Sequence, residues 1–151
     1  MTSSAQVVQL FETQVFNHSS IVAVSPNVLT YDIVRDSEPE LDRLYHQQEI
    51  SFWVLLVGRG EVINTTGPRE LIFDIAIQLF REKDTSGDNW KAVRDGIDSL
   101  TDRVAATLYN DSGGLFDYLE VQSGPPTIQQ QNEFETQVWR GLFTYRAFKI
   151  Q

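Results

Sequence analysis

Two histidines, His18 and His46, are the side chains of this sequence that could act as a general base near neutral pH. A catalytic histidine needs a positioned partner, and neither one stands beside a recognisable triad. Histidines at the surface or in the packed interior are more common than catalytic histidines. The chain has no cysteine, so thiol nucleophiles, disulfides and thiolate metal sites are excluded, and two histidines alone do not make up the usual zinc ligand set.

A cluster of acids between residues 32 and 42 offers a second kind of chemistry, because paired carboxylates can act as general acid and base. The acids are Asp32, Asp36, Glu38, Glu40 and Asp42. Nothing apolar nearby would raise a carboxyl pKa, so the composition favours a solvated, exposed loop. A small hydrolase or ligand-binding domain that uses His46 with these acids remains an alternative, and it predicts a pocket of converging polar groups.

The segment Asp84–Asp88 has the composition of a calcium loop but not its spacing. Its glycine comes two positions early, and the twelfth position is Asp95 rather than a bidentate glutamate. A helix cap after a polar turn explains these residues better. Phosphate-binding, dinucleotide-binding, zinc-protease and serine-hydrolase motifs are all missing from the sequence. We therefore expect no enzyme, no cofactor and no metal site.

The bulk composition is that of one globular domain spanning residues 1–151, with 41% hydrophobic and 22% charged residues. The net charge of −9 repels phosphate, so tight binding of nucleic acid is not expected. This charge fits either simple solubility or a surface past which DNA slides without sticking. The longest apolar run, Phe52–Val57, is too short to span a bilayer, and the first residues do not read as a secretory signal.

Hydrophobic periodicity predicts the elements of the first half of the chain. Residues Ser4–Phe16 have a broad apolar helical face, whereas Ile21–Val24 and Val28–Val34 are β-branched and extended in character. Glu49–Val57 reads as a strand that is apolar on both faces, and Gly58–Gly60 is expected to turn the chain.

The hydrophobic pattern is clearer in the second half of the chain. Arg69–Glu82 is a long strand with apolar residues at every second position, and a helix capped by Asp88 or Asn89 follows. Its apolar stripe consists of Trp90, Val93, Ile97, Leu100, Val104 and Leu108. Leu115–Val121 and Phe134–Ile150 are strands. The order predicts an α+β domain, a mostly antiparallel sheet with an N-terminal helix and one long amphipathic helix packed on it.

Between those last two strands, the polar stretch from Gln122 to Glu133 is too long for a tight hairpin. It is expected to form a protruding arm or a mobile tip. The alternating aromatics Trp139, Phe143 and Tyr145 suggest core or interface rather than a base-stacking platform, because the acidic field disfavours nucleic acid.

With these elements in place, the sequence resembles the tail terminator (tail completion) family of long-tailed bacteriophages. The resemblance rests on four places in order. They are the N-terminal helix with Val7, Val8, Leu10 and Phe11, the strand Leu71–Ile77, the amphipathic helix from Trp90 to Leu108, and the closing strand Val138–Arg146. It covers most of the chain as an order of elements.

The resemblance implies a non-enzymatic virion protein that assembles in the host cytoplasm as a ring, usually of six subunits. Such a ring caps the tail tube, binds the head–tail connector or stopper protein, and lets DNA pass through its lumen. It implies no membrane partner. An acidic lumen would keep the duplex from adhering, and the residues we assign to it are Asp36, Glu38, Glu40 and Asp42.

Two further sets of residues are expected at contacts between subunits or with partners. The arm set is Pro125, Pro126, Gln129, Gln130 and Gln131, and the aromatic set is Trp139, Phe143 and Tyr145. Apolar area that one helix layer does not cover usually signals a partner. Another neck or tail component, such as a head completion, stopper or tube protein, is the nearest alternative, and an adaptor domain is a further one.

Overall fold

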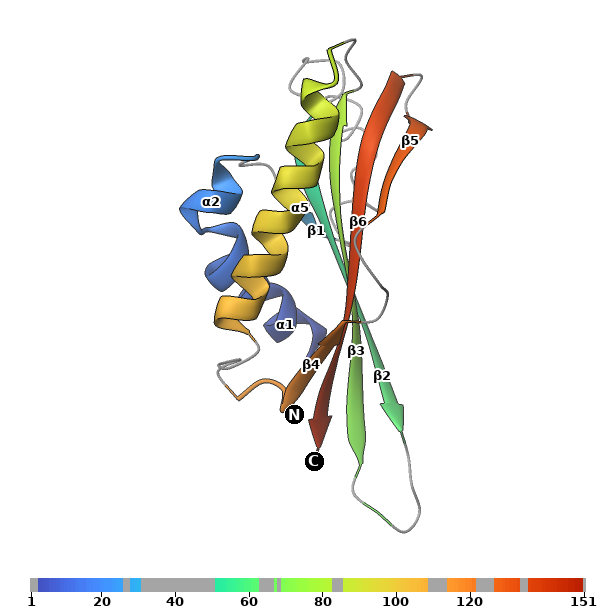
Figure 1. Ribbon diagram of the computed structural model, residues 1–151. Coiled ribbons are helices and arrows are strands. Elements are labelled where there is room, and N and C mark those ends of the chain that lie inside the picture. Colours follow the sequence, from blue (N-terminus) through green and yellow to red (C-terminus); the bar gives the residue numbers. More distant parts are fainter. Residues whose placement is uncertain are drawn as a thin grey trace.

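A computed structural model shows a twisted β-sheet with helices packed against one of its faces (Figure 1). The structure describes residues 3–25, 28–30, 51–62, 67, 69–82, 86–108, 114–121, 127–133 and 136–150. The predicted α+β fold is confirmed, with a mostly antiparallel sheet, an N-terminal helix and a 20-residue helix packed on it.

The sheet is built around three long antiparallel strands, β2 (Ser51–Val62), β3 (Glu70–Glu82) and β6 (Thr136–Ile150). The short β1 (Val28–Thr30) runs parallel to β2 at one edge. At the other edge, two strands lie end to end along β6. β4 (Tyr118–Val121) pairs with residues 145–148 of β6, and β5 (Thr127–Glu133) pairs with residues 136–142.

The register places one apolar row of each long strand beneath the helices. Across the sheet, Leu55 stands opposite Ile77, which stands opposite Phe143, and all three side chains are buried. Because side chains alternate between faces, this register commits every second residue of β3 to the core. The buried β3 row is Leu71, Phe73, Ile75, Ile77 and Leu79, as the sequence predicted.

Helix α5 (Asp88–Thr107) lies along β3 and β6 and buries Val93, Ile97, Leu100 and Val104 on its inner face. The predicted side-chain cap at Asp88 or Asn89 is wrong. The N-cap residue is Gly87, whose φ of +80° is a left-handed conformation that glycine adopts without strain. The Ser86 hydroxyl accepts a hydrogen bond from the Asp88 N–H at 3.3 Å.

The N-terminal segment forms α1 (Ser4–Phe11), continues as a single π-helical turn, η1 (Glu12–Phe16), and then forms α2 (Ser19–Val22). The helix predicted over Ser4–Phe16 is therefore present. The extended conformation predicted for Ile21–Val24 is wrong, because His18 caps a short helix there. Its Nδ1 accepts a hydrogen bond from the Ser20 N–H at 3.3 Å, and Ile21 is buried.

Strand β2 does not turn at Gly58–Gly60 as predicted but runs on to Val62. Residues 58–62 each pair with a residue of β3, from Asp74 to Glu70. Long-range pairing with an uninterrupted apolar strand thus outweighs the local turn tendency of two glycines.

Part of the predicted arm is a strand of the sheet instead. In β5, Thr127 pairs with Leu142 and Glu133 pairs with Thr136. The residues Gln129, Gln130 and Gln131 therefore belong to an edge strand, whereas Pro125 and Pro126 lie outside the described residues.

Candidate functional site

The second face of the sheet lies opposite the described helices (Figure 1); Val54 and Phe80 are buried at one end of it, whereas the other end is exposed. We call it the open face. Near the C-terminal end of β6 the register brings Ile72, Phe148 and Tyr118 into one row across β3, β6 and β4, with Gly60 of β2 at its end. Ile150, two residues beyond Phe148, lies in the next row.

Ile72, Phe148, Tyr118 and Ile150 together form an aromatic and aliphatic strip that is partly exposed to solvent. The rings of Tyr118 and Phe148 stack with centroids 4.5 Å apart and planes 14° from parallel. Tyr118 is 45% exposed and Ile150 is 51% exposed. These are two of the four large apolar side chains that the described part of the chain exposes; the other two, Val22 and Trp90, lie on α2 and α5.

A charged row borders the strip on the same face. Arg146 Nε donates a hydrogen bond to Asp74 Oδ1 at 2.9 Å, and Glu120 stands opposite Arg146 on β4. On the other side of the strip, Tyr118 Oη donates to Glu70 Oε1 at 3.0 Å. Asp74 and Glu120 thus lie beside Arg146, and Glu70 lies across the strip, so carboxylates outnumber the one guanidinium on this part of the surface. We call the strip and its charged border the acidic apolar patch, which consists of Glu70, Ile72, Asp74, Tyr118, Glu120, Arg146, Phe148 and Ile150.

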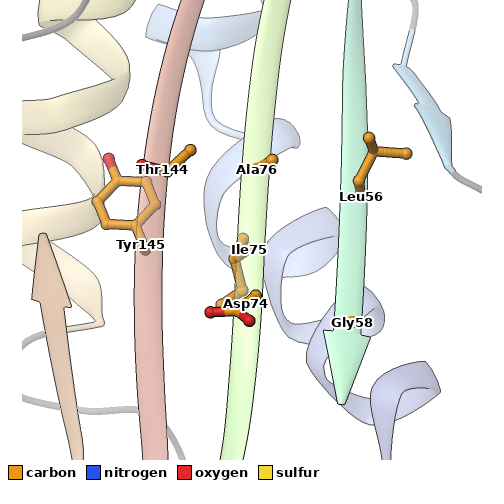
Figure 2. A pocket seen from close by; sticks show the side chains of 7 residues that line it. All are labelled: Leu56, Gly58, Asp74, Ile75, Ala76, Thr144 and Tyr145. Atoms are coloured by element: carbon orange, nitrogen blue, oxygen red, sulfur yellow. The ribbon is translucent and has the colours of Figure 1, made fainter. Parts of the chain in front are cut away.

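A depression of about 150 Å³ adjoins the charged row (Figure 2). Its walls come from β2, β3 and β6 and consist of Leu56, Gly58, Asp74, Ile75, Ala76, Thr144 and Tyr145. It exists because two of the open-face positions, Gly58 and Ala76, carry little or no side chain. Its lining is mostly apolar, with the Asp74 carboxylate at its rim.

The pKa values of Tyr118 and Asp117, which lie at this end of the sheet, are both shifted. Loss of hydration, together with the hydrogen bond to Glu70, raises the pKa of Tyr118 above the ordinary value of tyrosine, so its hydroxyl is a neutral donor at physiological pH. The backbone N–H of Ile150 donates to Asp117 Oδ2 at 2.7 Å, and this bond lowers the pKa of Asp117.

The outer face of α5 carries a second acidic surface. Asp88, Asp95, Asp98 and Asp102 are all exposed along this helix, where they outnumber the exposed cations Lys91 and Arg94. Arg94 pairs with Asp95 at 3.2 Å, and its guanidinium lies 5.3 Å from the centre of the Trp90 ring. We call the four aspartates the α5 acidic stripe.

Two residues of the predicted aromatic interface are core residues. Phe143 is 3% exposed and Tyr145 is 1% exposed, and the Tyr145 ring lies 6.5 Å from that of Phe11 in α1. The helix layer covers them within the chain, so they offer no exposed surface to a neighbour, and the prediction is corrected for both. Trp139 is partly buried and packs against the core. The predicted lumen acids Asp36, Glu38, Glu40 and Asp42 lie outside the described residues.

Sequence reasoning missed the strip on the open face, although the signal was present. Phe148 and Ile150 lie on the second face of the closing strand, but only the register shows that Ile72 and Tyr118 join them. Among the residues that the structure describes, no three His, Asp or Glu side chains group as metal ligands, and no helix is long and apolar enough to cross a membrane. No protein-family model matches the chain, and no curated protein is significantly similar to it in sequence.

Proposed function

We propose that the chain is a non-enzymatic structural subunit of a bacteriophage neck, of the tail terminator type. In this proposal it forms a ring, of about six copies as is usual for closed assemblies of that family, at the end of the tail tube. The ring stops tube growth, binds the head–tail connector, and lets DNA pass through its centre. The protein would act in the virion after assembly in the host cytoplasm.

The observation that supports this proposal most is the apolar strip at the exposed end of the open face. Helices cover one face of β2, β3 and β6, while the other face exposes Tyr118 and Ile150 beside partly buried Ile72 and Phe148. Clustered apolar surface of this kind is usual where a subunit meets a partner. A structural subunit must offer such surfaces, whereas an enzyme must offer a pocket with converging polar groups.

The charge of the exposed surfaces fits a channel for DNA. The α5 acidic stripe carries exposed negative charge and lies in the part of the chain that the structure describes. We expected the same kind of charge from the loop acids Asp36, Glu38, Glu40 and Asp42. Carboxylates that face a duplex at close range repel its phosphates, and the repulsion falls off over about 8–10 Å at physiological salt. Either surface would therefore keep DNA from adhering to the wall of a narrow lumen.

Arrest of tube growth tests the proposal. Tube protein encoded by the same genome would be polymerised with and without this chain, and tube lengths would be measured by negative-stain microscopy. We expect added protein to stop elongation and to appear as extra density at one tube end. Tubes that reach the same lengths in both samples, with bare ends, would refute the proposal. An equal mass of an unrelated acidic protein controls for effects of charge alone.

A further inference from the structure

We infer that the acidic apolar patch is the docking site for a basic protein surface, one that presents an aliphatic or aromatic side chain next to lysine or arginine. The inference concerns a surface and the chemistry of its partner. It does not depend on the ring, and it holds or fails independently of the proposed function.

The apolar strip supplies the anchor of this site. Tyr118 and Ile150 are each about half exposed, at 45% and 51%. The Tyr118 ring is fixed by its stack on Phe148 and by its hydrogen bond to Glu70, and the Ile150 backbone N–H is held by Asp117. A partner that covers the strip loses little side-chain entropy at Tyr118, because two contacts already hold that ring.

The depression beside the strip suits a single apolar side chain. Its volume of about 150 Å³ lies between Leu56, Ala76 and Thr144, and a cavity of roughly this size accepts a benzene-sized group. Asp74 stands at the rim, so a side chain that enters it places the neighbouring residues of the partner next to a carboxylate (Figure 2).

The charges decide which kind of partner fits. Glu70, Asp74 and Glu120 outnumber Arg146, which is already paired with Asp74. A second copy of the chain would bring two acidic patches together if it used the same face, and a nucleic acid would bring phosphates to an acidic surface. A lysine or arginine next to the apolar anchor instead meets carboxylates on both sides of the strip.

A defined peptide probe tests this inference. A fluorescent peptide that alternates leucine and lysine would be titrated with the full chain, and binding would be followed by anisotropy. Two matched peptides replace every leucine by serine or every lysine by glutamate. We expect the leucine–lysine peptide to bind and both matched peptides to bind at least about tenfold more weakly. Equal binding of the serine peptide would overturn the apolar anchor, and no binding of any peptide would overturn the site.

Paired variants locate the site on the protein. Ile150→Ser and Glu120→Lys change the patch, whereas Val22→Ser on α2 and Asp98→Lys on α5 make the same chemical changes at exposed positions on the helix side. We expect each patch variant to weaken peptide binding about tenfold and each control to change it less than about twofold. Equal losses for patch and control variants would show that binding follows bulk charge or hydrophobicity, and would contradict the inference.

Two additional measurements keep the result unambiguous. Circular dichroism melts confirm that each variant is folded, and Tyr118→Ser replaces Ile150→Ser if the latter melts early. Sedimentation of the free chain reveals whether the patch binds a second copy. Self-association that Ile150→Ser and Glu120→Lys abolish, and the two controls do not, would overturn the basic partner in favour of self-docking. None of these outcomes bears on whether the chain arrests tube growth.

Discussion

Phe73→Ala should lower the free energy of unfolding by about 3–5 kcal/mol, the range found for removal of a buried phenylalanine. Phe73 is fully buried on the helix side of β3, and its row holds Arg59 on β2 and Ala147 on β6. Neither neighbour is a large apolar group that could move into the space, so a cavity would remain. Urea denaturation followed by circular dichroism measures the loss.

The adjacent residue is the matched control for the one-sided core. Asp74 points to the open face, its side chain is 61% exposed, and it pairs with Arg146, which is 37% exposed. Asp74→Ala should therefore cost no more than about 1 kcal/mol, as is usual for an exposed ion pair. Losses of similar size at positions 73 and 74 would mean that both faces of the sheet are buried, and would contradict the layer arrangement.

Gly141→Val should destabilise the protein by about 1–3 kcal/mol or more, because it forces extra atoms into a filled interface. A Cβ atom at Gly141 would lie 2.7 Å from Cγ1 of Ile97 and 2.9 Å from Cγ1 of Val93. Both are branch atoms close to the backbone of α5, so the helix itself would have to move away from β6. Thermal and urea unfolding would both report the change.

Gly58→Val is the matched control for Gly141→Val. Gly58 also lies in a long strand, but on the open face, where the nearest atom to an added Cβ is the carbonyl oxygen of Asp74 at 4.0 Å. Valine favours strands, so this variant should be neutral or slightly stabilising, within about 0.5 kcal/mol. If Gly141→Val were equally neutral, α5 would not pack closely on β6.

Much of this fold could be predicted from the sequence because two elements carry strong periodicity. In β3, apolar residues at every second position from Leu71 to Leu79 form the buried row. In α5, spacings of three and four between Val93 and Val104 form the stripe that packs on the sheet. In each case the pattern follows directly from which face is buried, so local sequence and tertiary packing agree.

The errors occurred where distant partners decide the structure. Two glycines at 58 and 60 resemble a turn, but pairing with β3 keeps them extended. The β-branched Ile21 suggests a strand, but the cap at His18 and burial of the side chain favour a helix. Residues 127–133 have no apolar pattern and still form β5, because β6 offers an edge with which they pair.

The candidate site was less predictable than the fold for a related reason. Ile72, Tyr118 and Phe148 are far apart in the sequence, and only the cross-strand register makes them neighbours. The same register corrected the interface assigned to Phe143 and Tyr145, since it places both beneath the helices. Alternation along one strand shows that two faces differ, but it does not show which of them the helices cover.

The mass of the purified protein in solution tests the central proposal most directly. It would be measured by light scattering with negative-stain images of the same peak, for the chain alone and after addition of the tail tubes that the proposal assigns to it. We predict a closed ring of about six subunits with a central hole, free or seated at tube ends. A monomer or dimer that remains so at every concentration, and leaves tube ends bare, would contradict the proposed role in the neck.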